Sequence, residues 1–320
     1  MQPSASSNAK NRQEAWKSYW ASGNLHSCVT SYDGNYSGAI AAFWANAFSG
    51  LAGQSRVLDL ATGNGAIPKL LHDLKGADVL IDAVDATQVA PRWHVPAEQS
   101  HIRFHSGIWM EHLPFADASF DCICSQFGIE YAERPGAWQQ ALRVLKPDGR
   151  LHCVIHHADS IVTKIAAQER AHCQWLLGNG GLLQAAVQLA PWWLQRRSQP
   201  AVPPSGQAEL ARSEYNQAQA RLAERIERGG TVDLLLQARE QVQAILVNAK
   251  NPVLALQDYG QQLQEAELRC SELVQCAMTR DDMTGLIHWL EGQRPAKSLR
   301  MEELSQAEGL IAWGLSLTDA

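Results

Sequence analysis

The sequence lacks the cysteine patterns that hold small secreted folds or bind zinc. It contains seven cysteines in 320 residues, an odd number, with no Cys-x-x-Cys pair and no His/Cys cluster at zinc spacing. We therefore expect reduced thiols in a cytoplasmic protein and no metal site.

Long apolar runs and an excess of basic charge are also missing. No stretch reaches the roughly 18 apolar residues that a membrane span needs, and Met1 to Asn11 carries no apolar core typical of a signal peptide. The 27 basic residues are outnumbered by 33 acidic ones, which gives a net charge of −6. This balance lacks the electrostatic footprint of a nucleic-acid-binding protein. We expect neither nucleic acid nor membrane as a partner.

The residues that are present suit a large α/β fold. Hydrophobic residues make up 46% of the chain, enough for one large domain or for a core with an insertion. Short apolar runs predict strands over Arg56–Ala61, Val79–Ala86, Ile102–Gly107, Phe120–Ser125 and Arg150–His157. Helical stretches lie before and between them, at Gln13–Ser22, Gly38–Leu51, Gly65–Leu74, Pro91–Gln99 and Pro135–Leu145, and a turn is expected at Lys146–Gly149. This alternation predicts a parallel sheet with right-handed crossovers and helices on both faces.

Beyond His157 the pattern becomes helical for more than a hundred residues. Helices are predicted over Ser160–Leu177, Gln207–Arg228, Val232–Asn248, Gln257–Met278 and Asp281–Glu291, followed by a closing hairpin of Ser298–Ser305 and Leu310–Thr318. We expect four regions: an N-terminal covering segment (1–55), a ligand-binding core (56–157), a helical cap (158–279) and a return to the core (280–320).

One segment indicates a ligand site. Val57 to Ile67 reads as a strand that carries Asp59 and then enters a helix through the turn Gly63-x-Gly65. Such a turn lies at the carboxyl end of a strand, where open α/β sheets bind ligands. Asp85, at the end of the second strand, suits the hydroxyls of a ribose. The third glycine of a dinucleotide site would fall at Pro68, and Asp59 would repel a pyrophosphate. The pattern favours a cationic adenosyl ligand over a nicotinamide dinucleotide.

Four motifs in order resemble one family. They are Val57–Gly65, Val84–Ala86, Leu113–Asp121 and Leu142–Arg150, and they are similar to those of class I S-adenosylmethionine-dependent methyltransferases of the small-molecule group. The resemblance covers about a third of the chain. It implies a Rossmann-like seven-stranded sheet of order 3-2-1-4-5-7-6, whose last strand is inserted antiparallel, with the helical insertion between strands 5 and 6. It also implies S-adenosylmethionine as cofactor and S-adenosylhomocysteine as product.

The resemblance assigns roles to individual residues. Asp59 and Gly63 are similar to the residues that hold the methionine end, Asp85 to the one that holds the ribose, and Ser125 and Gln126 to those beside the methyl group. Adenine recognition departs from the family pattern: either Glu111 or a backbone group replaces the usual carboxylate, with Trp109 or Met110 packing on the ring. The predicted cofactor set is Asp59, Ala61, Thr62, Gly63, Gly65, Asp85, Ala86, Met110, Glu111, Ser125 and Gln126.

Methyl transfer needs few acid–base groups, because the cofactor supplies the reactive group and the protein supplies alignment. The candidate bases are His156, His157 and Glu130, each of which could instead be a packed structural residue. Asp59 could instead cap its turn, and Leu113–Asp121 reads as structural. The favoured interpretation is methyl transfer to a small-molecule acceptor by in-line displacement. The alternative is a cofactor-binding scaffold without catalysis, and a homodimer stays open.

Overall fold

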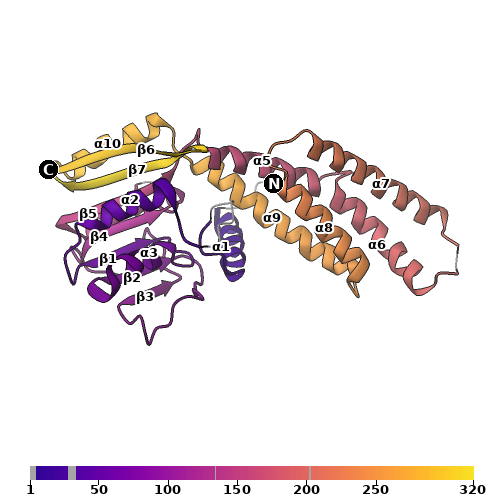
Figure 1. Ribbon diagram of the computed structural model, residues 1–320, viewed down its shortest axis with the longest axis horizontal. Coiled ribbons are helices and arrows are strands. Elements are labelled where there is room, and N and C mark those ends of the chain that lie inside the picture. The colour runs from indigo at the N-terminus through magenta and orange to yellow at the C-terminus, as the bar shows by residue number, and fades with distance from the viewer. Residues whose placement is uncertain (1–4, 28–33, 134, 202) are drawn as a thin grey trace. The chain divides into compact units, whose positions relative to one another are not determined.

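The computed structural model describes residues 5–27, 34–133, 135–201 and 203–320. The chain divides into two compact units, residues 1–164 with 272–320, and residues 165–271. The strands are β1 (Arg56–Leu60), β2 (Leu80–Asp85), β3 (Ile102–Ser106), β4 (Phe120–Gln126), β5 (Leu145–His156), β6 (Lys297–Gln306) and β7 (Gly309–Asp319). The helices are α1 (Ala5–Ala21), α2 (Gly38–Ser49), α3 (Ala66–Lys75), α4 (Gly136–Val144), α5 (Ile161–Leu177), α6 (Leu182–Ser198), α7 (Gly206–Glu227), α8 (Asp233–Asn248), α9 (Pro252–Cys276) and α10 (Arg280–Gln293), labelled in Figure 1. Two short 3-10 helices, η1 (Gly76–Asp78) and η2 (Ile129–Tyr131), complete the elements.

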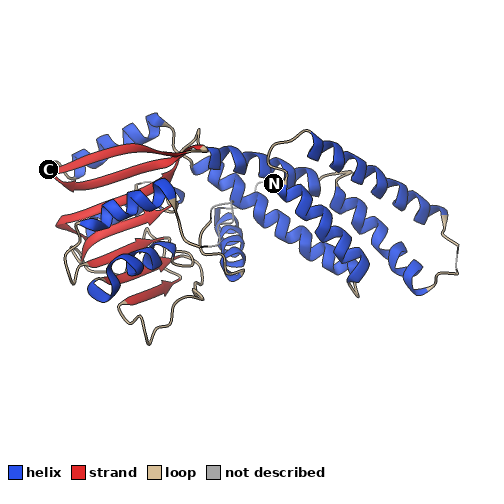
Figure 2. Cartoon of the chain, in the orientation of Figure 1, coloured by secondary structure: helices blue, strands red, loops and turns tan. Residues whose placement is uncertain are grey.

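The first unit is built on one seven-stranded sheet of order β3-β2-β1-β4-β5-β7-β6, which Figure 2 shows in red. β1 pairs in parallel with β2 and β4, and β7 pairs antiparallel with β5 and β6. The predicted fold class is therefore confirmed, including the strand order and the helices α5 to α9 between β5 and β6.

Alternate residues of the central strands face two separate cores. Leu58 and Ile123 belong to the core that also contains α4 and α10, whereas Val57 and Cys124 belong to the one under α2 and α3. Because both faces are covered, β1 is buried along almost its whole length. Polar side chains gather instead at the carboxyl ends of the parallel strands.

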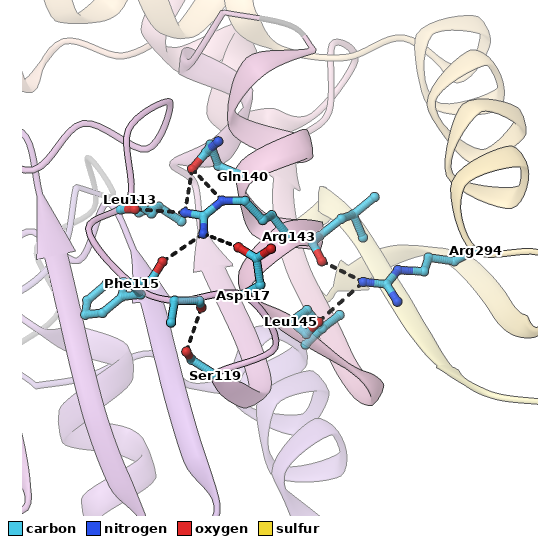
Figure 3. Close-up of polar contacts among 10 residues, drawn as sticks. Leu113, Phe115, Asp117, Ser119, Gln140, Arg143, Leu145 and Arg294 are labelled. Carbon is cyan, nitrogen blue, oxygen red and sulfur yellow. Dashed lines mark hydrogen bonds and ion pairs between the residues drawn. The ribbon is translucent and has the colours of Figure 1, made fainter.

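A single arginine fixes the loop before β4 (Figure 3). The Arg143 guanidinium donates to the carbonyl oxygens of Leu113 and Phe115, at 2.9 and 2.8 Å, and forms an ion pair with Asp117 at 2.7 Å. The hydroxyl of Ser119 closes the following turn on the carbonyl of Ala116. The contacts of this loop are structural, as we expected for Leu113–Asp121.

The structure corrects three local predictions. Pro91–Gln99 forms turns and not a helix, because Pro91 and Pro96 lack the amide hydrogens that a helix requires. Lys146–Gly149 lies inside β5, beside a register shift against β4, and is not a separate turn. Helix α6 was not predicted because Pro191 falls within it.

The second unit has its own hydrophobic core. Leu182, Leu222 and Leu235, from α6, α7 and α8, are fully buried in it. No helix among the described residues is long and apolar enough to cross a membrane.

Candidate active site

A cavity opens at the carboxyl ends of β1, β2 and β4, and its lining comes entirely from the first unit. Eight of the predicted cofactor residues line it: Asp59, Ala61, Thr62, Asp85, Ala86, Met110, Glu111 and Gln126. Gly63, Gly65 and Ser125 are not among the lining residues. Most of the predicted cofactor residues thus cluster around one cavity.

The turn after β1 needs glycine at Gly63. Its φ is +52°, and a Cβ atom there would lie 2.5 Å from Cζ2 of Trp20. Any L side chain at this position would introduce both backbone strain and a steric overlap. The turn is held from β2, since Thr62 donates its amide hydrogen to the carbonyl of Val84. The tight glycine turn lets α1 approach the loop directly.

Two buried carboxylates face the cavity. Asp85 accepts hydrogen bonds from the amides of Gly63 and Thr87, at 2.9 and 2.8 Å, and from the Thr87 hydroxyl at 2.7 Å. Asp59 is 2% exposed, and burial, together with the negative charge of Asp85, raises its pKa to about 7. Burial likewise raises the pKa of Asp85. Among the described residues no basic side chain is bonded to either carboxylate, and two desolvated carboxylates of this kind suit a cationic ligand.

The cavity also contains a cation, Arg12, but it is directed elsewhere. Its guanidinium pairs with the carboxylate of Glu272 and donates to the carbonyl of Tyr131 at 3.4 Å. The charge of Arg12 is therefore balanced by Glu272 and leaves the two aspartates uncompensated.

At the end of β4 two neighbouring polar residues do different work. Trp44 donates its indole hydrogen to Oε1 of Gln126 at 2.6 Å, which fixes the amide orientation. The buried Nε2 of Gln126 has no hydrogen-bond partner among the described residues. The Ser125 hydroxyl instead donates to the carbonyl of Leu60 and accepts from the amide of Ile129. Gln126 keeps a donor for a ligand, whereas Ser125 ties β4 to β1.

The stretch expected to contact adenine also lines the cavity. Ile108, Trp109, Met110 and Glu111 all contribute to the wall, and Ile108 donates its amide hydrogen to the carbonyl of Asp85 at 2.9 Å. Oε1 of Glu111 accepts a hydrogen bond from the amide of Glu133 at 3.1 Å. Glu111 is thus placed by the chain after η2.

Helix α1 belongs to the N-terminal segment that we expected to cover the site, but none of its residues was in the predicted site set. Arg12, Gln13, Trp16 and Trp20 line the cavity. Gln13 donates to the carbonyl of Ala86 at 2.7 Å. Asn64 donates to the carbonyl of Trp20 at 2.9 Å. The sequence gives the helical range of this segment but not which of its side chains reach the cavity.

His26, in the loop after α1, is a further wall residue outside the predicted site set. It lines the cavity, is 7% exposed and stacks on Tyr36 with ring centroids 4.8 Å apart. Burial lowers its pKa, which favours the neutral imidazole, and its Nδ1 has no partner among the described residues. Residues 28–33 of the same loop lie outside the described residues.

The three candidate bases do not line the cavity. His156 and Glu130 form one buried pair, with His156 Nδ1 2.7 Å from Glu130 Oε1. His157 stacks on Trp313 at 4.1 Å, and its Nδ1 accepts the amide hydrogen of Asp159. The structure therefore brings His156 and Glu130 together and places His157 against the closing hairpin.

The order of the seven strands is that of the class I methyltransferase fold. Residues 58–153 match the family model described as "Methyltransferase domain". This part of the chain is a class I S-adenosylmethionine-dependent methyltransferase domain, and S-adenosylmethionine is the cofactor of the class.

Curated relatives that match this chain carry the name "Ubiquinone/menaquinone biosynthesis C-methyltransferase UbiE". The protein from Pseudomonas fluorescens is 32% identical over 154 residues, which are 44% of this chain and 60% of the relative. The one from Dinoroseobacter shibae is 38% identical over 103 residues, 30% and 40% of the two chains. The match thus spans less than two thirds of these relatives.

Solved structures show weaker likeness. A methyltransferase from Aquifex aeolicus is 21% identical with a TM-score of 0.33, covering 38% of this chain and 65% of that one. Geranyl diphosphate C-methyltransferase from Streptomyces coelicolor is 15% identical with a TM-score of 0.39, covering 50% and 72%.

Proposed function

We propose that this protein transfers the methyl group of S-adenosylmethionine to a small, planar acceptor. The observation that carries the proposal is the pairing of two uncompensated buried carboxylates, Asp59 and Asp85, with a wall of aromatic rings in one cavity. The rings belong to Trp16, Trp20, Tyr36, Trp109, Phe127 and Tyr131. Carboxylates suit the cationic cofactor, and aromatic faces suit a flat apolar acceptor.

Each cofactor-facing residue has a proposed task. Asp59, with the Gly63 turn, holds the ammonium end, and ionises fully once a cation is beside it. Asp85 has about four acceptor sites, of which three are used by Gly63 and Thr87, so one is left for a ribose hydroxyl. Met110 and Glu111 border the adenine end. Gln126 offers its free amide hydrogens beside the reacting groups.

When bound, S-adenosylmethionine supplies an electrophilic methyl group and a sulfur leaving group. The chain excludes water with Trp16 and Trp20 and aligns the acceptor. An acceptor that carries a hydroxyl must lose its proton, and His26, neutral and in the wall, is the group proposed to accept it. The name of the relatives, a C-methyltransferase of ubiquinone and menaquinone biosynthesis, supports a planar acceptor of this kind.

Calorimetry with S-adenosylmethionine, followed by mass-spectrometric screening of phenols, hydroquinones, amines and carboxylates for an added methyl group, tests the proposal. We expect binding and turnover on a planar acceptor. Binding without turnover on every acceptor class would support a non-catalytic scaffold, and absence of binding would overturn both.

A further inference from the structure

Behind the aromatic wall lies a buried acid–imidazole pair, neither member of which is among the lining residues. Glu130, in η2, and His156, the last residue of β5, have side chains that are 0% and 3% exposed. Oε1 of Glu130 accepts two hydrogen bonds, from the backbone amide of His156 at 3.0 Å and from its imidazole Nδ1 at 2.7 Å. Both bonds join η2 to the end of β5.

The imidazole of His156 supports two cavity-lining rings. It stacks on Phe127, with centroids 4.1 Å apart and an interplanar angle of 21°, and meets Tyr131 edge to face at 5.8 Å. Phe127 and Tyr131 both line the cavity, whereas His156 does not. The pair therefore lies directly behind this part of the wall.

The segment that the pair holds is under strain and tightly packed. Phe127 has φ +52°, a conformation that costs a bulky L residue free energy and persists only where its surroundings enforce it. The next residue, Gly128, lies so close to the loop after β1 that an added Cβ atom would be 2.6 Å from that of Ala61. The segment therefore has no room to move towards that loop.

The same segment reaches the covering helix. The ring of Tyr131 meets Trp16 of α1 edge to face at 5.9 Å, and its carbonyl accepts a hydrogen bond from Arg12. One short 3-10 helix thus connects β5, the cavity wall and α1.

A purely structural pair would be expected to satisfy both carboxylate oxygens, yet Oε2 of Glu130 is buried and has no partner among the described residues. Buried pairs of this kind contribute little to stability compared with apolar residues of similar size. Their presence at a cavity wall indicates a role in the site itself.

We infer that Glu130 and His156 are positioning residues, which hold Phe127 and Tyr131 in the geometry required for methyl transfer. The inference rests on the proposed function and assigns no contact with substrate to either residue. Glu130 fixes the imidazole through Nδ1 and the backbone amide, and the imidazole in turn supports Phe127 from behind.

Four variants separate hydrogen bonding from ring stacking. Glu130→Gln keeps Oε1 as acceptor, and Glu130→Met removes it. His156→Phe keeps a ring against Phe127 but loses the bond to Glu130. Ser316→Ala is the matched control, because it removes the partner of another buried histidine of β5, His152, whose Nδ1 lies 2.9 Å from the Ser316 hydroxyl.

The first measurement needs no acceptor. Crystal structures of each variant with S-adenosylhomocysteine should show Phe127 and Tyr131 displaced in Glu130→Met, retained in Glu130→Gln and unchanged in Ser316→Ala. Calorimetric Kd values for S-adenosylhomocysteine should stay within about threefold of the wild type in all variants. Unmoved rings in Glu130→Met would overturn the inference.

The second measurement uses the hydroquinone or phenol that shows turnover in the acceptor screen. Glu130→Met should lower kcat on the order of 10²-fold, the effect of a misplacement of about 1 Å, while KM for S-adenosylmethionine changes little. His156→Phe should show a smaller decrease in kcat than Glu130→Met, and Glu130→Gln should keep most of the wild-type kcat. A loss of kcat in Ser316→Ala equal to that in Glu130→Met would contradict a positioning role. Failure of the wild type to bind S-adenosylhomocysteine would refute the proposed function and is a separate outcome.

Discussion

Among single residues, Asp59 has the protonation state on which the site depends most. Its pKa in the folded chain is about 7, against an ordinary value of 3.8, because burial penalises the carboxylate. Between these two pH values the unfolded chain has lost a proton that the folded chain keeps. Folding stability is therefore lost as the pH rises from about 4 to about 7. A cation bound beside Asp59 would reverse this penalty.

Asp59→Asn should consequently separate stability from binding. We expect a higher Tm for the ligand-free protein above pH 7, and a loss of about 10- to 100-fold in affinity for S-adenosylmethionine, as for the loss of one charge-assisted contact. Wild-type affinity should rise with pH up to about 7 and then level off, whereas the variant should show no such rise. Calorimetry at pH values on either side of 7 measures this.

Asp82 provides the matched control for Asp59. It is also a buried carboxylate of the central sheet, but it pairs with Arg56 at 2.7 Å and with His105 at 2.9 Å. Asp82→Asn should lower Tm and leave cofactor affinity unchanged. An equal change in affinity for the two variants would contradict the role of Asp59.

Gly63 gives a prediction about backbone geometry. Gly63→Ala places a Cβ atom 2.5 Å from Trp20 at a φ of +52°, so the turn must shift or α1 must move. Binding of S-adenosylmethionine must then restore the original turn against a strain of about 1–2 kcal/mol. This corresponds to a loss of roughly tenfold in affinity for S-adenosylmethionine. Gly53→Ala, where a Cβ atom meets nothing within 4 Å, should bind like the wild type. Equal affinities for both variants would show that the turn tolerates a side chain.

Among the elements, the junction of β5 and β7 carries an acid-sensitive group. His152 is opposite Ser316 in this antiparallel pair, and burial lowers its pKa from 6.5 to about 4. The unfolded chain therefore binds a proton at a pH where the folded chain does not. His152 therefore costs no folding stability above about pH 6.5, where it is neutral in both states. The free energy of unfolding decreases as the pH falls from about 6.5 towards 4.

Replacing His152 by glutamine should flatten this acid dependence. We expect Tm of the wild type to fall between pH 6.5 and 4 by more than that of His152→Gln, with the difference absent above pH 7. Thermal unfolding followed by circular dichroism across this range is the measurement. The exposed His288, with a side chain 92% exposed, is the control position, and its glutamine variant should follow the wild type.

The elements also show where sequence reasoning succeeds. β1 to β4 were predicted within one or two residues, because buried parallel strands give short apolar runs between turn residues. Asp59 and Asp85 could be chosen because Asp85 ends β2 and Asp59 is the last residue but one of β1. The same local logic failed for α6, where Pro191 interrupts the pattern although buried residues on both sides continue it.

The remaining features depend on contacts between distant segments. Trp16 meets Tyr131 across more than a hundred residues of sequence. A covering segment was expected at residues 1–55, but no local pattern indicates that Trp20 would pack on the glycine turn. Glu130 and His156 looked like separate candidate bases, and only their contact at 2.7 Å shows that they form one pair. Strand alternation thus predicts the sheet and the residues at its edge, but not the wall that other elements add to it.

In the whole molecule, the two units have separate cores and the cavity belongs to one of them. Leu58 is buried in the sheet unit and Leu235 in the helical unit. A ligand stabilises the part of a protein that it binds, by an amount that grows with its concentration relative to Kd. We therefore expect calorimetric unfolding in two transitions, with S-adenosylhomocysteine raising the temperature of only one.

The variant Leu235→Ala shows which unfolding transition belongs to the helical unit. Leu235 is fully buried in α8, so its truncation should cost about 2–5 kcal/mol and lower the transition that S-adenosylhomocysteine does not move. Leu236→Ala, at the 39%-exposed neighbouring position of the same helix, should leave both transitions nearly unchanged. If Leu235→Ala and S-adenosylhomocysteine shift the same single transition, the two units unfold as one, and the helical unit stabilises the cofactor site despite contributing no residue to its lining.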